Sequence, residues 1–399
     1  MSLTHALRQS SAATTPDRRH LAVTRLMLTN FRSYAHAELC VSGRPVVLAG
    51  PNGAGKTNLL DAISLLSPGR GMRGALLAEH IRKAPQTAQN DVLWAVAASV
   101  SRDSETYEIG TGLVSSAQGN ERRKVHLNGV PAQSSAELGE IVEMAWLTPA
   151  MDRLFSDSAS ARRRFLDRLV LGFDAAHARR VLRYEHAMRE RARLLKLGPR
   201  DSGWLDGLEN EMAEAGIEIA AARAATVERL NVSLVQRGEA GAFPSAQLAL
   251  AGHTDRILAE EGGRAVESLR IALAGARLRD AEARRTTVGP HVSDLSARHT
   301  GKRMDARDCS TGEQKALLIS IVLADARELA QQRGGGAPIL LLDEIAAHLD
   351  SQRRAALFEE LVALGAQAWL TGTDLTLFED LTSHADIFLV EASKLVRQN

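Results

Sequence analysis

A short glycine-rich loop is the clearest sign of chemistry in this sequence. Residues 50–57 read Gly-Pro-Asn-Gly-Ala-Gly-Lys-Thr and fit the pattern G-x-x-x-x-G-K-[ST]. Glycines at these positions leave backbone N–H groups free to surround phosphate oxygens at the start of a helix. The alternative is a glycine turn that only caps a helix. The residues predicted to bind ATP are Gly50, Pro51, Asn52, Gly53, Ala54, Gly55, Lys56 and Thr57.

Four side chains have chemical roles in this prediction. Lys56 would pair with the β- and γ-phosphates and assist catalysis, and Thr57 would give its hydroxyl oxygen to Mg²⁺. Asp343 and Glu344 follow the apolar run Ile-Leu-Leu-Leu at residues 339–342, and ligands bind α/β sheets at the carboxyl ends of such strands. We expect Asp343 to hold Mg²⁺ and Glu344 to polarise the attacking water as a catalytic residue. Acidic turn residues often follow strands, so this signal depends on the loop upstream.

A third segment, residues 310–314, opens a helix. The ordinary interpretation is a helix capping box formed by Ser310 and Glu313. It leaves Gly312 unexplained, because glycine weakens a first helical turn unless backbone must approach another group closely. We therefore expect this helix start to meet the γ-phosphate bound by a second copy of the chain. The predicted segment is Ser310, Thr311, Gly312, Glu313 and Gln314.

The elements needed to position these segments can be read from periodicity. Residues 46–49 form a short apolar strand before the glycine loop, and residues 56–66 have helical spacing after it. Alternating segments around the loop predict a hairpin and an antiparallel layer. Their ranges are 23–28, 37–41, 92–100, 105–114 and 124–127.

From about residue 150 the composition changes to Ala, Leu, Arg and Glu, which favour helices. The expected helices are residues 160–171, 175–196, 205–230 and 254–274. The last hundred residues return to α/β texture, with a helix at 311–332 and strands at 339–342, 368–370 and 387–390. We expect residues 1–20 to be a flexible tail, residues 21–150 and 286–399 to form one α/β domain, and residues 151–285 to be a helical insert.

Composition limits the classes of function. The chain has 399 residues with 45% hydrophobic residues and a formal net charge of +1, so any surface for nucleic acid must be local. The two cysteines, Cys40 and Cys309, have no CxxC partner, which fits a reducing cytoplasm. No apolar run approaches the roughly 18 residues that a membrane span needs.

The three segments in this order resemble the head domains of ABC-type ATPases: a Walker A loop, a signature motif and a Walker B strand. The signature lies 254 positions after Lys56, whereas transporter ATPases have a short insert and Rad50 and SMC proteins insert hundreds of coiled-coil residues. The chain is more similar to the RecF family of bacterial recombination mediators. The supporting stretches are LTNFRSY at 28–34, RRRFLD at 162–167, GPH at 289–291 and STGEQK at 310–315.

This resemblance implies an α/β fold, an ABC-ATPase head interrupted by a helical second lobe. It adds Arg32 to the ATP-binding residues and makes Asp350 the D-loop residue. It further implies an ATP-dependent homodimer on gapped or junction DNA, slow hydrolysis of ATP, and cooperation with RecR and RecO in RecA loading, replication restart and SOS induction. Two alternatives stay open, an ATP-switched adaptor for protein partners and a transport-type ABC ATPase. Two departures from the expected pattern are Val292-Ser293 after GPH, and residues 371–374 where transporters place a γ-phosphate-sensing histidine.

A local excess of basic residues is the candidate DNA surface. Residues 153–200 contain thirteen Arg or Lys against five Asp or Glu, and such a face could bind duplex phosphates. The alternative is a solvated helix face with pairs such as Glu185 and Arg189, four residues apart. Few aromatic residues argue against stacking on single strands. The predicted contacts are Arg162, Arg163, Arg179, Arg180 and Arg183.

Overall fold

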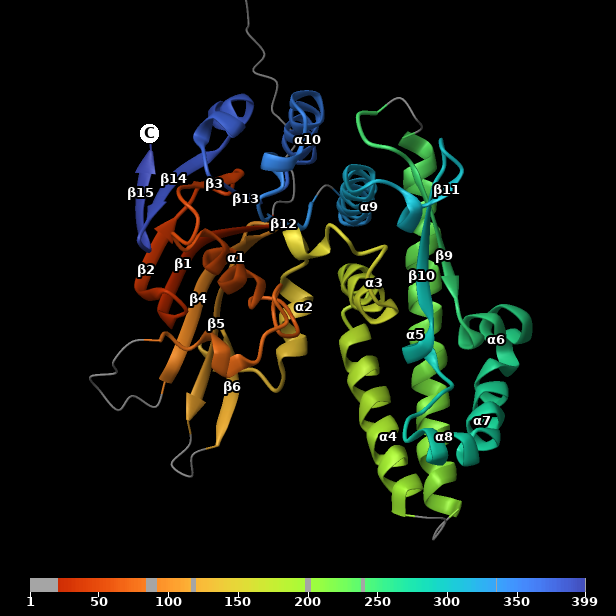
Figure 1. Cartoon of the computed structure of the whole chain (residues 1–399). Helices are drawn as coiled ribbons and strands as arrows, with labels where there is room; N and C mark the ends of the chain where they lie inside the picture. The colour runs from red at the N-terminus through yellow and green to blue at the C-terminus, as the bar shows by residue number, and fades with distance from the viewer. Residues whose placement is uncertain are drawn as a thin grey trace, which may run out of the picture.

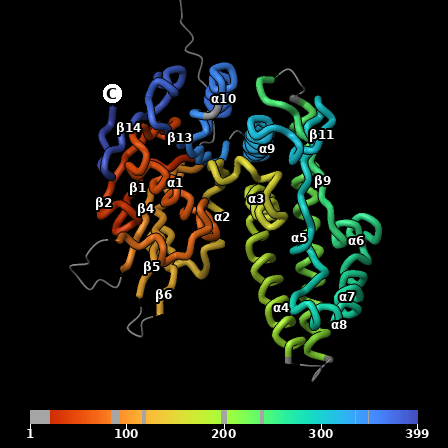
Figure 2. The backbone as a smooth tube through the Cα atoms, viewed as in Figure 1, coloured from red at the N-terminus to blue at the C-terminus, as the bar shows by residue number. Residues whose placement is uncertain are grey.

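The computed structural model describes residues 21–83, 92–115, 120–197, 202–237, 241–334 and 336–398. The tail expected at residues 1–20 lies outside them. Within the described residues the strands form three sheets. Figures 1 and 2 show two of these sheets on one side of the molecule and long helices on the other. None of the described helices is both long and apolar enough to cross a membrane.

A mainly parallel sheet carries the glycine loop. Its strand order is β15-β14-β3-β13-β12-β8, and only β15 runs antiparallel to its neighbour. The strands predicted at 46–49, 339–342, 368–370 and 387–390 are all confirmed, whereas β8 was not predicted. The bounds are β3 Val46–Ala49, β8 Met144–Leu147, β12 Ile339–Leu342, β13 Ala368–Gly372, β14 Asp386–Glu391 and β15 Lys394–Gln398.

A second sheet is antiparallel throughout, with the order β2-β1-β4-β5-β6-β7. It confirms the predicted hairpin, in which Phe31 pairs with Tyr34, and the predicted antiparallel layer. Alternate residues of β4 are buried, as expected for a sheet with one face on the core. The bounds are β1 Ala22–Phe31, β2 Tyr34–Cys40, β4 Val92–Arg102, β5 Glu105–Ser115, β6 Glu121–Leu127 and β7 Val130–Pro131.

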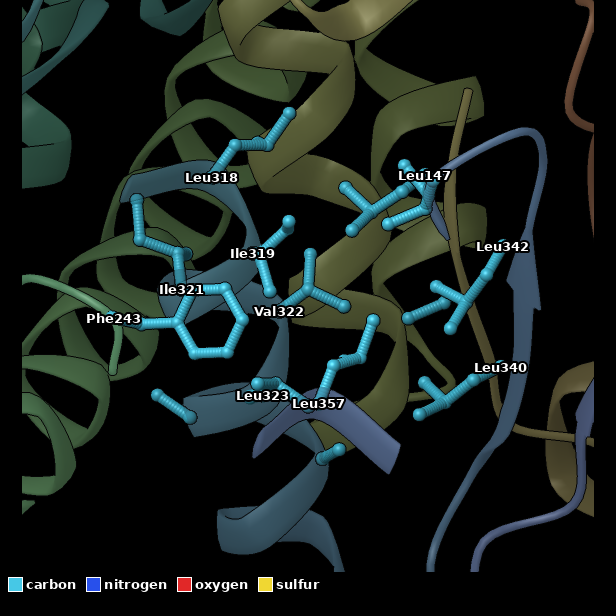
Figure 3. Close-up of a cluster of buried hydrophobic side chains, with 14 of the residues drawn as sticks. Leu147, Phe243, Leu318, Ile319, Ile321, Val322, Leu323, Leu340, Leu342 and Leu357 are labelled. Carbon is cyan, nitrogen blue, oxygen red and sulfur yellow. The ribbon is translucent and has the colours of Figure 1, made fainter. Parts of the chain in front are cut away.

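Helix α1 (Lys56–Ser64) lies between these two sheets and follows the glycine loop directly. Alternate residues of the parallel strands face opposite sides. Leu341 belongs to the core around α1, while Leu340 and Leu342 belong to the core around α9 (Thr311–Gln332). Figure 3 shows this second core, where Leu340 and Leu342 of β12 lie near Val322 of α9. Burial on both faces explains why the parallel strands are continuously apolar.

The helical lobe contains the predicted helices. Helices α4 and α5 pack side by side along its length (Figure 1), and α3 connects them to β8 through the short turn at Pro149–Met151. The predicted helix at 254–274 is two helices, separated at the Gly262–Arg264 turn. The bounds of the helices within residues 151–285 are α3 Ala159–Phe173, α4 His177–Leu197, α5 Ser202–Arg237, α6 His253–Glu261, α7 Ala265–Gly275 and α8 Arg277–Ala283. Outside this range lie α2 Leu138–Ile141 and α10 Ser351–Leu364.

The helical insert also contains one strand that was not predicted. Strand β9 (Ala246–Ala251) lies within it and pairs with β10 (Asp294–His299), which also pairs with β11 (Met304–Asp305). Alternating burial in β9 is typical of a half-buried strand. The strand is too short to change the average composition of the segment around it. Residues on both sides of position 285 therefore share one sheet. The division into lobes at that position stays a prediction.

Candidate nucleotide-binding site

The glycine loop has the backbone that the phosphate-binding pattern requires. Gly50, Gly53 and Gly55 have φ values of 151°, 80° and 113°, in the region that favours glycine. A Cβ atom on Gly50 would lie 2.1 Å from the Val390 carbonyl oxygen, and one on Gly55 would lie 2.7 Å from the Tyr34 hydroxyl. The close approach of β14 and of the β1–β2 hairpin therefore requires glycine at both positions.

Lys56 begins α1 and folds back over the loop. Its Nζ donates to the carbonyl oxygens of Gly50 at 2.6 Å and Pro51 at 2.9 Å. Burial lowers the pKa of the Lys56 ammonium, and the nearby carboxylates of Glu344 and Asp343 oppose this shift. The loop thus holds a cation at its centre, where the sequence predicts phosphate.

The two predicted Mg²⁺ ligands meet. Thr57 donates its hydroxyl to Oδ1 of Asp343 at 3.0 Å, across 286 positions of sequence. Burial raises the pKa of the Asp343 carboxyl, and hydrogen bonds from Thr371 and Thr57 counteract this. A hydroxyl and a carboxylate in contact at the end of a phosphate loop are the hard oxygen donors that Mg²⁺ prefers. This donor set fits the predicted metal.

Thr371 is part of this cluster, although the sequence singled it out only as a departure from transporters. Its hydroxyl donates to Asp343 Oδ1 at 2.8 Å and accepts from the Glu344 N–H at 2.8 Å. Glu344 has a φ of 53°, which is uncommon for a residue other than glycine. The pairing of β13 with β12 brings Thr371 to the two acidic residues, so no local sequence pattern could identify it.

Arg32 lies against α1. Its Nε donates to Oδ2 of Asp61 at 2.6 Å, and the Asp61 side chain is fully buried. Beside it, the Tyr34 hydroxyl donates to the Gly55 carbonyl oxygen at 3.2 Å, and Asn58 of α1 donates to Ser33. The hairpin turn therefore supports the glycine loop. The direct role of Arg32 in binding ATP stays a prediction.

The predicted signature segment begins α9 and forms the capping box. Ser310 accepts from the Glu313 N–H at 3.4 Å, and Glu313 accepts from the Ser310 N–H at 2.9 Å. The Glu313 carboxylate also pairs with Lys302, and these partners lower its pKa to about 2. Thr311 and Gly312 are exposed, and nothing lies within 4 Å of the Cβ position of Gly312. The capping box accounts for Ser310 and Glu313, but not for this glycine.

Gln314 does not fit the predicted contact with a second copy. It is buried, its Nε2 donates to the Cys309 carbonyl oxygen at 2.9 Å, and its Oε1 accepts from Ser156 at 3.1 Å. Gln314 therefore fixes the start of α9 within its own chain. Asp350 likewise caps α10, where it accepts from the Arg353 N–H at 2.8 Å. Its D-loop role stays a prediction.

The arginines predicted to contact DNA fall into two groups. Arg162 binds both carboxylate oxygens of Asp294, at 2.7 and 2.8 Å, and Arg163 donates to the Ser293 carbonyl oxygen. These two side chains join α3 to β10 and are engaged inside the chain, which argues against them as phosphate contacts. The other three are on α4: Arg180 pairs with Asp174, Arg183 with Glu218, and Arg179 is exposed. The pair of Glu185 and Arg189 also forms, at 3.6 Å.

Sequence comparisons identify close relatives over nearly the whole chain. Residues 22–394 match the family model described as the RecF/RecN/SMC N-terminal domain. A DNA replication and repair protein RecF of Mesorhizobium japonicum is 48% identical over 370 residues, which covers 92% of this chain and 96% of that protein. The protein of the same description from Agrobacterium fabrum is also 48% identical, with 93% and 97% covered.

Solved structures agree on the fold. One described as the recombination mediator protein RecF-ATP in the RecFOR pathway has a TM-score of 0.81 and 23% identity, and covers 96% of this chain and 99% of its own. An SMC head bound to the C-winged helix domain of ScpA has a TM-score of 0.53 and 17% identity, with 95% and 98% covered. These likenesses confirm the predicted ABC-ATPase head, and with the relatives above they show that the chain belongs to the RecF family of DNA replication and repair proteins.

Proposed function

We propose that this chain binds ATP and Mg²⁺ at residues 50–57 and hydrolyses ATP slowly, and that its ATP-bound form dimerises on DNA during recombinational repair in the cytoplasm. The contact between Thr57 and Asp343 at 3.0 Å carries the proposal. It joins the Walker A and Walker B segments, and the oxygens of both side chains lie beside the loop that would hold the phosphates. The RecFOR relative with ATP in its description supports the same ligand.

Four side chains would divide the chemistry. Lys56 exchanges its two carbonyl partners for the β- and γ-phosphate oxygens, and Thr57 with Asp343 holds the metal. When bound, Mg²⁺ neutralises charge that develops on the phosphates. Glu344 is only partly buried, and its carboxylate orients and polarises the attacking water.

A second copy of the chain would complete the site. Ser310 caps a 22-residue helix, whose exposed N-terminus favours an anion. The open space at Gly312 leaves room for a phosphate to approach the backbone. Together these features support ATP held between the loop of one copy and the signature helix of the other.

DNA and repair proteins are the proposed partners. Arg179 and Arg183 are exposed on α4 and would contact backbone phosphates of gapped or junction duplex. The RecFOR description of the structural relative supports RecR and RecO as protein partners. The proposed result of these interactions is RecA loading at gaps, with replication restart and SOS induction downstream.

ATP binding and turnover, measured with and without gapped duplex, test the proposal. The parent chain should bind ATP and hydrolyse it slowly, with a higher rate on gapped duplex. Lys56→Ala should abolish both binding and turnover, whereas Lys124→Ala, at an exposed lysine on β6, should leave both unchanged. A turnover rate that is the same with and without DNA would instead favour the ATP-switched adaptor. A parent chain that does not bind ATP would refute the proposal.

A further inference from the structure

Thr371 occupies a place in the site that the proposed function does not yet use. It lies at the end of β13, is 1% exposed, and its single hydroxyl makes two hydrogen bonds at once. It donates to Asp343 Oδ1 and accepts from the backbone N–H of Glu344, each at 2.8 Å. One hydroxyl therefore links the predicted metal-binding carboxylate to the backbone of the predicted catalytic residue.

Each of the two bonds constrains a different group. Asp343 Oδ1 accepts from Thr57 as well as Thr371, so hydroxyls on two sides hold the carboxylate at the end of the glycine loop. Glu344 has a φ of 53°, and such a backbone persists only where its surroundings support it. The bond from the Glu344 N–H to Thr371 supplies that support directly where the chain turns after β12.

We propose that Thr371 is a positioning residue for ATP hydrolysis, because it sets the Asp343 carboxylate and the Glu344 backbone in one fixed relation. This inference rests on the proposed function. Thr371 touches neither phosphate nor water in this role. It acts through the Asp343 carboxylate and the Glu344 backbone, so losing its hydroxyl should affect the chemical step and Mg²⁺ binding more than the binding of nucleotide alone.

Two matched pairs of side chains isolate the hydroxyl. Thr and Val at position 371 have nearly the same shape and differ by the hydroxyl, with the methyl group kept. Ser and Ala both lack that methyl group and differ from each other by the hydroxyl. Comparing Thr371→Ser with Thr371→Ala therefore still tests the hydroxyl if Thr371→Val does not fold. Thr226→Val is the control for burial, because Thr226 is also 1% exposed and donates only to the Ala222 carbonyl oxygen of its own helix.

The measurements are kcat and KM for ATP, the Mg²⁺ concentration that gives half-maximal turnover, ATP affinity in EDTA, and the melting temperature. Loss of a hydrogen bond to a charged group should lower kcat by about 10- to 100-fold in Thr371→Val. The Mg²⁺ requirement should rise, while ATP affinity in EDTA stays within about threefold of the parent. Thr371→Ser should keep most of kcat, and Thr371→Ala should lose it as Val does.

Other results would overturn the inference. One is a kcat in Thr371→Val equal to that of the parent, and another is equal turnover by the Ser and Ala variants. A third is that Thr226→Val and Thr371→Val lose the same amount of kcat and the same amount of melting temperature. Thr371 would then act only as a buried core residue. If the parent chain neither binds nor hydrolyses ATP, the proposed function fails first, and the inference falls with it.

Discussion

Asp343 and Glu344 are neighbours in sequence, yet the chain holds them differently. The Asp343 side chain is buried and accepts hydrogen bonds from Thr57 and Thr371. Glu344 is partly exposed, and only its backbone N–H is held by Thr371. A fixed carboxylate suits a metal ligand, and a more accessible one suits a group that acts on water. The division of roles at this site follows from these two environments.

The role of Glu344 leads to a specific expectation for Glu344→Gln. The amide keeps the shape of the side chain but cannot take up a proton, so turnover should fall by about 100-fold or more. ATP binding should persist, and an ATP-bound dimer should accumulate. Single-turnover kinetics and ATP-binding isotherms check both parts. Glu359→Gln, at an exposed residue of α10, is the matched control, and parent-like turnover by Glu344→Gln would remove Glu344 from catalysis.

At the scale of elements, α9 connects the signature segment to the rest of the chain. Close to its start, Lys315 pairs with Asp152 at 3.3 Å in the segment that follows β8. Further along, α9 packs on the face of the parallel sheet opposite α1. From α3, the Arg168 guanidinium stacks on Trp146 of β8, 4.2 Å from the ring centre. Side chains of β8 and β12 thus share one packed core with the signature helix.

Buried Asp325 in α9 makes the stability of the folded chain depend on pH. Burial raises the pKa of Asp325 to about 8, although the nearby Arg168 opposes the shift. The folded chain thus binds a proton that the unfolded chain releases near pH 4, so the contribution of Asp325 to stability falls as pH rises from about 4 to 8. Asp325→Asn removes the ionisable carboxyl and with it this loss of stability at high pH. Its melting temperature should exceed that of the parent by several degrees at pH 8.

The comparison that checks this prediction is a set of thermal melts at pH 5.5 and pH 8. The gain from Asp325→Asn should be larger at pH 8, and Asp380→Asn, at an exposed residue, should show no such trend. A variant less stable than the parent at pH 8 would show that Asp325 is ionised and paired in the fold.

The exposed arginines of α4 give the DNA proposal a quantitative form. Each phosphate contact contributes about 0.9 to the slope of log affinity against log salt concentration. Replacing Arg179 and Arg183 with Ala should therefore reduce the magnitude of that slope by about two and weaken DNA binding. The loss of stability should be small, because the broken pair of Arg183 with Glu218 is exposed. Arg162→Ala is the contrasting variant, because it breaks the pair with Asp294 and should lower the melting temperature. An unchanged salt slope in the double variant would place the DNA elsewhere.

The sequence was sufficient for elements whose signal is local. The glycine loop, the strand before it and the apolar strand at 339–342 each have a pattern within about ten residues, and all three are confirmed. Strands β8 and β9 were missed because four to six residues of ordinary composition become strands only beside their partners. The same reason explains why the contacts of Thr371 and Gln314 were not predicted. Thr371 bonds Asp343 and Gln314 bonds Ser156, and both partners are distant in sequence.

At the scale of the whole molecule, one copy of the chain holds two half-sites. In the part of the chain that the structure describes, no hydrogen bond or ion pair joins residues 50–57 to residues 310–314. The loop already has its Walker B partner, while the signature helix presents Ser310 and an open Gly312. A second copy that brings its signature to the first copy's loop accounts for both observations.

The most direct test of this account is light scattering with ATP, with ADP and without nucleotide, each with and without DNA. The account predicts a dimer with ATP, most clearly in Glu344→Gln, and a monomer without nucleotide. Ser310→Arg should stay monomeric with ATP while its loop still binds the nucleotide, and Ser383→Arg, at an exposed residue, should dimerise like the parent. A parent chain that is monomeric under every condition, or a Ser310→Arg variant that dimerises with ATP, would contradict the shared site.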